Sequence, residues 1–270
     1  VIDNLLYRNR LKEQDISCIV GGDLTNQIAA SNYAIRNFKI PFIGIYNACA
    51  TFPESLLLSA TLLEQSDFKN IISITSSHNL TAEKQFRYPV EYGAPKKAAS
   101  TFTATGSVGA ILTKDKSKIK IESATIGSIV DMDIKDVNHM GAIMAPAAAK
   151  VLNDHLEDMK RKEDYYDLIL TGDLGEIGAK IFREYSLIKY NIKLKKHLDA
   201  GEEIYANSQE TNAGASGPVT LPLVLFNKVL KNTRYKKILI LGTGALHSPS
   251  LVNQKESIPA ISHAVSLEVL

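Results

Sequence analysis

The chain has 270 residues, 45% of them hydrophobic and 22% charged, which is the profile of an ordinary soluble globular protein. Its 31 basic and 29 acidic residues give a formal net charge of +2, and no basic stripe alternates with aromatic residues, which argues against a nucleic-acid-binding protein. No apolar run reaches the ~18 residues of a membrane-spanning helix. Two cysteines are too few for a disulfide framework, and the sequence is otherwise typical of a cytosolic protein.

The first predicted elements are a helix and a buried strand. Residues 2–11 have a helix-like pattern, and nothing marks Val1 as a natural start, so we expect an upstream segment to be missing here. Residues 15–24 then read as a short apolar strand that ends in Gly-Asp-Leu. Cys18 lies within this strand, where a small buried core residue is expected.

The next strand and helix place a cysteine at their junction. Residues 42–46 predict a strand, and Asn-Ala-Cys-Ala around Cys49 then opens a helix-like run at 55–63. A thiol at a helix N-terminus feels the macrodipole and free backbone N–H groups, which favour the thiolate. The same geometry binds an anion without covalent chemistry, and an inert buried cysteine is the remaining alternative.

A third strand, at 69–74, brings polar residues to the same edge of the sheet. His78 and Asn79 follow this strand, so they should lie near Cys49. Further on, two strand-like segments flank a fully polar turn and predict a β-hairpin of 106–112 with 119–125.

The second part of the chain repeats the first. Residues 165–174 again form an apolar strand ending in Gly-Asp-Leu, and Asn-Ala-Gly-Ala at 212–215 again precedes a helix-like run and a strand, at 220–230 and 236–241. Two copies of strand, helix and strand predict a duplicated α/β fold with mainly parallel pairing. We expect an N-terminal half at 1–125 and a C-terminal half at 126–270. A helix at 147–161 and an exposed loop at 201–208 complete the second half.

The region around Cys49 resembles the nucleophile region of thiolases and initiating ketoacyl synthases. Residues 212–217 resemble the glycine-rich loop of thiolases, and 258–270 resemble their last two strands. The resemblance implies a thiolase-like α/β fold over the whole chain, with two duplicated halves and mixed, mainly parallel sheets in an α/β/α/β/α layering.

The departures from the thiolase pattern argue against thiolase catalysis. Acyl transfer in that superfamily uses a cysteine with a histidine and a second cysteine, histidine or asparagine. Residues 215–218 read Ala-Ser-Gly-Pro where thiolases carry Gly-His-Pro, and 258–260 read Ile-Pro-Ala where they place a second cysteine. The resemblance therefore implies a catalytically disabled protein; the alternative is an acyltransferase that uses Cys49 with His78 or His263 as base.

Three long strings, at 75–93, 140–149 and 254–259, resemble the stage V sporulation protein AD family. This resemblance implies binding of dipicolinic acid, or of its calcium chelate, during uptake into the forespore, with a link to germination and no cofactor or protein-bound metal. It implies a soluble chain in the forespore cytoplasm, held at the spore inner membrane by membrane proteins of the same operon, and leaves open a homodimer. A third interpretation is a structural subunit with a vestigial pocket.

A dipicolinate site needs cationic or N–H donors for two carboxylates and an apolar or aromatic wall. Arg87 could supply a bidentate fork, Tyr88 a stacking face, and Asp131 an oxygen ligand to a chelated calcium. Met140 could line a wall, His263 is either a pocket residue or a satisfied core histidine, and His247 is expected in a loop without a role. The predicted ligand-binding residues are Cys49, His78, Asn79, Arg87, Tyr88, Asp131, Met140 and His263.

Overall fold

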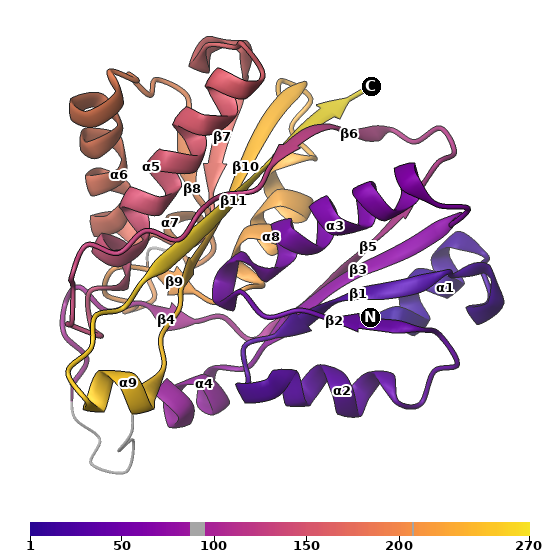
Figure 1. Cartoon of the computed structure of the whole chain (residues 1–270), viewed down its shortest axis with the longest axis horizontal. Helices are drawn as coiled ribbons and strands as arrows, with labels where there is room; N and C mark the ends of the chain where they lie inside the picture. Colours follow the sequence, from indigo (N-terminus) through magenta and orange to yellow (C-terminus); the bar gives the residue numbers. More distant parts are fainter. Residues whose placement is uncertain (87–94, 207) are drawn as a thin grey trace.

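The computed structural model describes residues 1–86, 95–206 and 208–270. Figure 1 shows two β-sheets with helices packed between them and on their outer faces. This is the α/β/α/β/α layering that the resemblance to thiolases implies, with parallel and antiparallel strands in both sheets.

The first sheet has four strands in the order β2-β1-β3-β5. They are β1 (Cys18–Asp23), β2 (Phe42–Gly44), β3 (Asn70–Ser77) and β5 (Gly106–Thr113). β1 pairs in parallel with β2 and β3, whereas β5 runs antiparallel to β3. Every residue of β1 is buried, because the strand is central in the sheet and helices cover both of its faces.

The second sheet has five strands in the order β6-β11-β10-β7-β8. They are β6 (Ile119–Thr125), β7 (Leu168–Thr171), β8 (His197–Asp199), β10 (Lys237–Ala245) and β11 (Ala260–Val269). A short parallel pair, β4 (Phe102–Thr103) with β9 (Ala215–Ser216), joins the two halves.

The central layer consists of α3 (Thr51–Gln65) and α8 (Thr220–Val224), which a π-helical turn continues over Leu225–Val229. The outer helices are α1 (Ile2–Asn9) and α2 (Ala29–Ile35) on the first sheet and α5 (Met140–Asp158) and α6 (Gly175–Tyr190) on the second. Short helices are α4 (Asn79–Phe86), α7 (Ala200–Glu203) and α9 (Pro249–Asn253). Single 3-10 turns lie at Glu13–Asp15, Asn26–Ile28, Ala48–Ala50 and Glu163–Tyr165.

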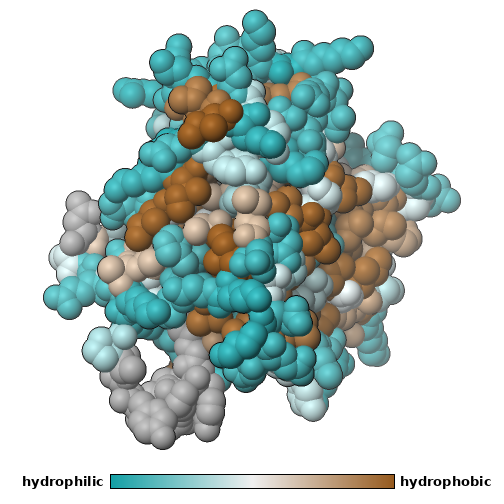
Figure 2. Space-filling view, turned by 60° about the vertical axis from the view of Figure 1, so that its left-hand side comes forward, coloured by the Kyte–Doolittle hydropathy of each residue, from teal (hydrophilic) through white to brown (hydrophobic). Residues whose placement is uncertain are grey.

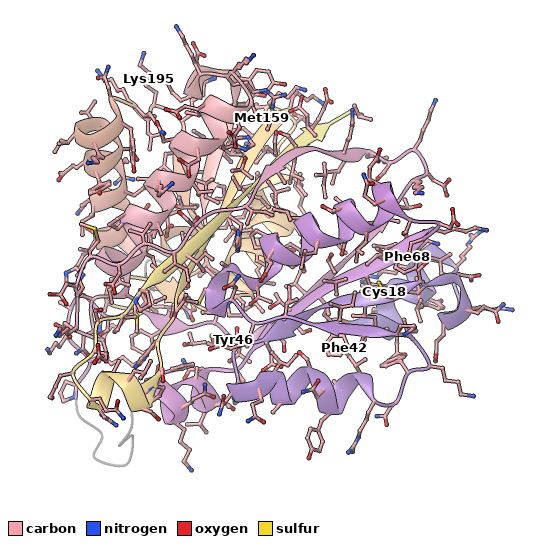
Figure 3. The ribbon with its side chains drawn as sticks, in the orientation of Figure 1. Cys18, Phe42, Tyr46, Phe68, Met159 and Lys195 are labelled. Atoms are coloured by element: carbon pink, nitrogen blue, oxygen red, sulfur yellow. The ribbon has the colours of Figure 1, made fainter. Side chains whose placement is uncertain are left out.

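Side chains alternate between the two faces along the strands of the first sheet, so they contribute to two separate cores. Ile19 and Ile72 pack towards α1 and α2, whereas Cys18, Val20 and Ile71 pack towards α3. Figure 3 marks Cys18 within this sheet. Cys18 is 2% exposed, so the prediction of a small buried core residue is confirmed.

The outer helices α5 and α6 cross closely because a glycine of each lies at the contact. A Cβ atom on Gly178 would lie 2.5 Å from the Cα atom of Gly141, which no side chain tolerates. This close approach fixes the start of α5 beside the end of β7, where the candidate site described below lies.

The predicted β-hairpin is wrong, because β5 and β6 enter different sheets. β5 pairs with β3 of the first sheet and β6 with β11 of the second. Ile119 and Ile121 of β6 pack on the core between the sheets, a contact that strand patterning alone does not reveal. β6 precedes the predicted boundary between the halves yet belongs to the second sheet; the division after residue 125 stays a prediction.

Three element predictions are also corrected. The helix expected from Ala147 begins at Met140. The expected exposed loop at 201–208 begins inside α7, whose Gly201 is buried. Residues 258–270 form one strand, β11, rather than two.

A charged cluster fastens β6 to the second sheet. Glu122 of β6 accepts hydrogen bonds from Tyr165, Lys237 and Ser266 and forms a salt bridge with Arg161 at 3.0 Å. Burial alone would raise the pKa of Glu122, but these hydrogen bonds and the Arg161 charge lower it to about 2.

Glu122→Gln should therefore reduce the acid dependence of stability. A carboxyl whose pKa is about 2 in the fold, against an ordinary 4.5, stabilises the protein fully above pH 4.5 and loses that contribution as the pH falls through 2. We expect the substitution to lower the free energy of unfolding by ~2 kcal/mol at pH 7 and by much less at pH 2.5. Urea denaturation at the two pH values checks this, and an equal loss at both would contradict it.

None of the helices in the part of the chain that the structure describes is both long and apolar enough to cross a membrane. The face shown in Figure 2 is largely hydrophilic, with patches of hydrophobic side chains between the polar ones.

Candidate functional site

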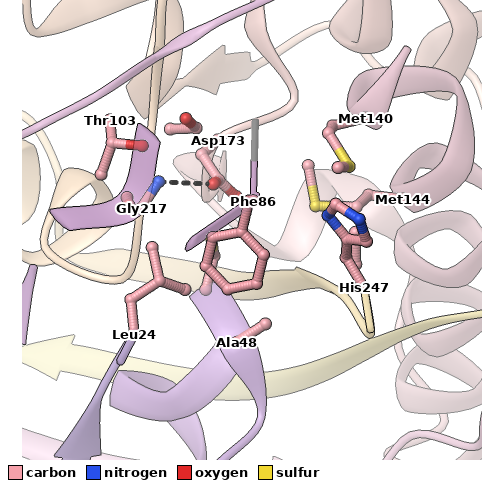
Figure 4. A pocket seen from close by; sticks show the side chains of 13 residues that line it. Leu24, Ala48, Phe86, Thr103, Met140, Met144, Asp173, Gly217 and His247 are labelled. Carbon is pink, nitrogen blue, oxygen red and sulfur yellow. Dashed lines mark hydrogen bonds between the residues drawn. The ribbon is translucent and has the colours of Figure 1, made fainter. Parts of the chain in front are cut away.

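A narrow pocket of about 60 Å³ lies where the two halves meet, and Figure 4 shows it from close by. Its wall comes from both halves: the ends of β1, β7 and β10, the 3-10 turn before α3, α4, the β4–β9 pair and the first turns of α5. Its lining residues are Leu24, Ala48, Cys49, Ala82, Phe86, Thr103, Met140, Met144, Asp173, Ser216, Gly217, Ala245 and His247. Most of these side chains are apolar, so the few polar groups decide what the pocket can bind.

Cys49 reaches the pocket from the 3-10 turn that directly precedes α3. The strand-to-helix position predicted for it is confirmed. Ala48, just before it, has a φ of 49°, in the left-handed region that residues with a Cβ rarely adopt. Such a conformation costs ~1 kcal/mol or more and is characteristic of functional sites, where it aims a side chain.

The polar centre of the pocket is formed by the Cys49 thiol and the Asp173 carboxylate, which line it together and influence one another's pKa. Asp173 follows β7 and is 1% exposed. Its carboxylate accepts hydrogen bonds from the Gly217 N–H at 2.9 Å and from the Thr243 hydroxyl at 2.7 Å. Figure 4 draws the bond from Gly217.

These surroundings keep the thiol protonated. Desolvation by burial raises the pKa of Cys49 well above its ordinary value, and the negative charge and hydrogen bond of Asp173 raise it further, outweighing the Gly217 N–H. Of the alternatives that the sequence leaves open, these surroundings favour a protonated, buried cysteine over a thiolate. Burial also raises the pKa of Asp173 to about 6, against hydrogen bonds from Cys49, Thr243 and Gly217 that lower it, so its carboxylate is mainly ionised at pH 7.

An aromatic and thioether wall faces this polar centre. The rings of Phe86 and His247 lie with centroids 5.2 Å apart and planes inclined by 37°. Met140 and Met144, one turn apart on α5, line the same cavity. A flat aromatic ligand has both ring faces and polarisable sulfur available to it here.

The structure brings two of the predicted ligand-binding residues together, Cys49 and Met140. His78 is exposed and lines a separate cavity of about 290 Å³. Leu24 and Ala82 line both this cavity and the Cys49 pocket. The expectation that His78 lies in the Cys49 pocket is wrong, because α4 begins at the next residue and carries the chain away.

Three other predicted residues are engaged elsewhere. Asn79 donates from its side-chain amide to the Thr103 carbonyl oxygen at 3.0 Å, and the exposed Asp131 accepts from the Ser257 hydroxyl at 2.6 Å. Neither lines the pocket. His263 is 3% exposed; its Nδ1 accepts from the Gly127 N–H at 3.2 Å, and its Nε2 lies 3.1 Å from the amide of Asn47.

Of the two alternatives left open by the sequence, His263 is therefore a core histidine whose ring nitrogens both have hydrogen-bond partners, and not a pocket residue. Arg87 and Tyr88 lie outside the residues that the structure describes.

The residues that matter most to the chemistry of the pocket were not predicted from the sequence. Asp173 is the aspartate of the second Gly-Asp-Leu, which served only as a sign of duplication. Its counterpart Asp23 instead accepts hydrogen bonds from the N–H groups of Thr25, just after β1, and of Ser31, in the first turn of α2. His247, expected in a loop without a role, lines the pocket.

The described residues contain no cluster of three or more histidine, cysteine or acidic side chains placed to hold a metal ion. Asp173 is the acidic residue in the described lining of the pocket.

Comparisons of structure show what this architecture is similar to. 3-Oxoacyl-[acyl-carrier-protein] synthase III from Aquifex aeolicus matches with a TM-score of 0.60 at 14% identity, over 97% of this chain and 80% of that one. Xanthomonas campestris OleA matches with a TM-score of 0.65 at 10% identity, over 97% of this chain and 78% of that one. At such identities the likeness establishes the thiolase-like fold alone.

Comparisons of sequence are more specific. The profile of the family described as stage V sporulation protein AD matches residues 1–268. The stage V sporulation protein AD of Bacillus subtilis (strain 168) is 40% identical over 266 residues, which cover 97% of this chain and 79% of that protein. The predicted family is thus confirmed: the chain belongs to the stage V sporulation protein AD family.

Proposed function

We propose that the chain binds dipicolinic acid, or its calcium chelate, in the Cys49 pocket and takes part in its uptake into the forespore during sporulation. The observation that carries this proposal is a narrow, mostly apolar pocket with an aromatic wall, in which a potential nucleophile is held as a neutral thiol. A pyridine ring would lie against Phe86, His247 and the methionines, and the thiol would donate or accept a single weak hydrogen bond.

The charge of Asp173 bears on which form of the ligand enters. A free dicarboxylate would be repelled by a buried, ionised carboxylate a few ångströms away. In the calcium chelate the metal still has open coordination positions, and the Asp173 carboxylate could occupy one of them. The described lining contains no lysine or arginine, so for the free dianion Arg87 is our candidate for charge compensation.

A non-catalytic role also fits the partners of Cys49. Nucleophilic cysteines work next to a base that accepts the proton, whereas Asp173 stabilises the protonated thiol. Neither His78 nor His263, the bases considered from the sequence, lines the pocket.

The alternative is an acyltransferase of the thiolase and ketoacyl-synthase type. Its support is that structural neighbours such as 3-oxoacyl-[acyl-carrier-protein] synthase III are enzymes and that His247 lines the same pocket as Cys49. Incubation with acetyl-CoA followed by intact-mass spectrometry separates the two, since an acyl group on Cys49 would favour the enzyme.

Ligand protection of Cys49 tests where dipicolinate binds. Saturating dipicolinate with calcium should slow alkylation of Cys49 by iodoacetamide, because the ligand would cover the thiol; Cys18, buried in the core, should stay unlabelled throughout. Arg87→Ala should weaken binding about tenfold if the arginine pairs with a carboxylate, and Cys49→Ala by less.

His78→Ala is the matched control, because His78 lines the neighbouring cavity and should leave affinity unchanged. Full alkylation at saturating ligand, or unchanged affinity in both Cys49→Ala and Arg87→Ala, would place the ligand elsewhere.

We also propose that the chain acts at the spore inner membrane through membrane proteins of the same operon, which flotation with inner-membrane vesicles would test. A homodimer through the edge strand β2 is favoured by the exposure of Ile43 within it and of Tyr46 just after it, at 40% and 41%. Figure 3 marks Tyr46 just beyond β2. Loss of self-association in Ile43→Lys, measured by sedimentation velocity, would support it.

A further inference from the structure

Four turns lie along one edge of the second sheet. They lead into β6, β7, β8 and β10 and span residues 114–118, 160–166, 191–196 and 231–236. β7 and β8 run parallel to β10, and β6 runs the same way because β11 lies antiparallel between β6 and β10. The amino ends of these four strands therefore meet at one edge of the sheet, together with the turns that lead into them.

These four turns, which we call the basic edge, concentrate the positive charge of the chain. Each contains three basic residues, so together they hold twelve of the 31 basic residues but three of the 29 acidic ones, a formal charge of +9. The remaining 19 basic and 26 acidic residues give the rest of the chain a charge of −7. The net charge of +2 therefore hides a strong separation of charge along the molecule.

The charges of the basic edge are available to a partner. Eleven of its twelve basic side chains are exposed. Among the residues that the structure describes, Arg161 is the one member that pairs with an acidic side chain, that of Glu122. Figure 3 marks Met159 and Lys195, at two of the turns, along the upper side of the molecule. The basic edge is thus a row of unpaired cations rather than a set of surface salt bridges.

Exposed apolar side chains stand beside these cations. Leu187 and Ile188, in the last turn of α6, are 46% and 84% exposed and come just before residues 191–196. The stretch from 185 to 198 has four lysines and no acidic residue. Exposed lysines next to exposed aliphatic side chains are typical of surfaces that bind a membrane interface, where the apolar groups enter the headgroup region.

We propose that the basic edge binds the surface of an anionic lipid bilayer directly, without a protein partner. Ten of its twelve basic residues are lysines, which act as point charges towards lipid headgroups, whereas arginine predominates where a base or phosphate is read in bidentate fashion. Four separate turns in a row also offer no helix or ribbon that could enter a nucleic-acid groove. The proposal goes beyond the proposed function and depends neither on dipicolinate nor on membrane proteins.

The Cys49 pocket lies at the other end of the same strands. Asp173 and His247, which line it, follow the carboxyl ends of β7 and β10, whereas the basic edge lies at their amino ends. A chain bound through the basic edge would hold the pocket away from the bilayer. The charge of −7 on the rest of the chain favours the same orientation, because an anionic surface repels it.

Flotation with protein-free vesicles tests the proposal. We expect the chain to float with phosphatidylcholine vesicles that contain about one third phosphatidylglycerol, and to stay behind with phosphatidylcholine alone. Raising the salt concentration from about 0.1 M to about 0.5 M should release it, because salt shortens the range of the attraction.

Paired variants separate the basic edge from charge in general. Lys195→Gln with Lys231→Gln removes two charges of the basic edge and should weaken vesicle binding about twentyfold. The control, Lys84→Gln with Lys255→Gln, removes two exposed charges at α4 and just after α9, which Figure 1 shows side by side away from the basic edge. It should leave binding within about twofold.

A third variant tests the apolar contribution. Ile188→Ser should weaken vesicle binding about fivefold at either salt concentration, since it removes an aliphatic group without changing the charge. All five substituted side chains in these variants are exposed, so each variant should unfold at the temperature of the unsubstituted chain.

Flotation that needs phosphatidylglycerol, and that falls in the Lys195 and Lys231 variant but not in the control, supports the proposal. No flotation, equal flotation with phosphatidylcholine alone, or an equal loss in both double variants overturns it. Binding to a labelled DNA duplex as tight as that to the vesicles, with Ile188→Ser unchanged in both, also overturns it, because the basic edge would then be a general site for polyanions.

Discussion

Asp173→Asn should make the Cys49 thiol about tenfold more reactive towards iodoacetamide at pH 8. The carboxylate is the largest cause, after burial itself, of the raised pKa of Cys49, through both its charge and its hydrogen bond. Removing a nearby negative charge lowers a thiol pKa, and each unit raises the thiolate fraction tenfold while the thiol is mainly protonated. Rates of carbamidomethylation at Cys49, followed by mass spectrometry, measure the change.

The double variant Cys49→Ser, Asp173→Asn is the control and should take up no label, because Cys18 is 2% exposed. An unchanged rate in Asp173→Asn would mean that burial alone sets the thiol pKa. Asp173 would then not be the group that keeps Cys49 from acting as a nucleophile.

Asp199→Ala should destabilise the protein by ~3–5 kcal/mol, the largest effect on stability that we expect. The Asp199 carboxylate is fully buried and accepts hydrogen bonds from the Thr171 hydroxyl at 2.6 Å and from three backbone N–H groups. These N–H groups belong to Leu174, Gly175 and Gly201, at 3.1, 2.9 and 3.0 Å. Alanine would leave several buried donors without an acceptor, each at a cost of ~1–3 kcal/mol.

The pH dependence of this variant gives a second test. Burial raises the pKa of Asp199 to about 7 despite its hydrogen bonds, with the charge of Asp173 adding to the rise. A carboxyl with a raised pKa contributes stability below its ordinary value that is lost as the pH rises through 7. The loss caused by Asp199→Ala, measured by urea denaturation, should therefore be larger at pH 5 than at pH 8; a loss under 1 kcal/mol at both would show that water replaces the carboxylate.

The parts of the fold that the sequence predicts are those with local signals. The strand-to-helix junction at Cys49 and the two Gly-Asp-Leu strands are short, contiguous patterns, and the structure confirms them. The partners of β5 and β6 are not local: both alternate in the way a hairpin does, and only the packing of Ile119 and Ile121 between the sheets shows which sheet β6 joins.

The residues of the candidate site likewise divide into those with a local signal in the sequence and those whose position depends on the fold. Cys49 was found because it stands at a recognisable strand-to-helix junction, whereas Met140 was found because it lies in a string that resembles the stage V sporulation protein AD family. Asp173 and His247 were missed because their roles depend on which strand ends meet in space, and both follow strands of the second sheet. His78 was misplaced for a related reason: it follows a strand of the first sheet, but α4 turns it into the neighbouring cavity.

Calorimetric titration with dipicolinate, with and without calcium and with acetyl-CoA as the control ligand, tests the central claim most directly. Saturable binding of dipicolinate or its calcium chelate, with no heat from acetyl-CoA, is the result that we predict from the Cys49 pocket. Tighter binding with calcium would assign Asp173 to the metal, whereas equal binding would point to Arg87. Binding of acetyl-CoA with an acyl group appearing on Cys49, and no response to dipicolinate, would contradict the account and favour an acyltransferase.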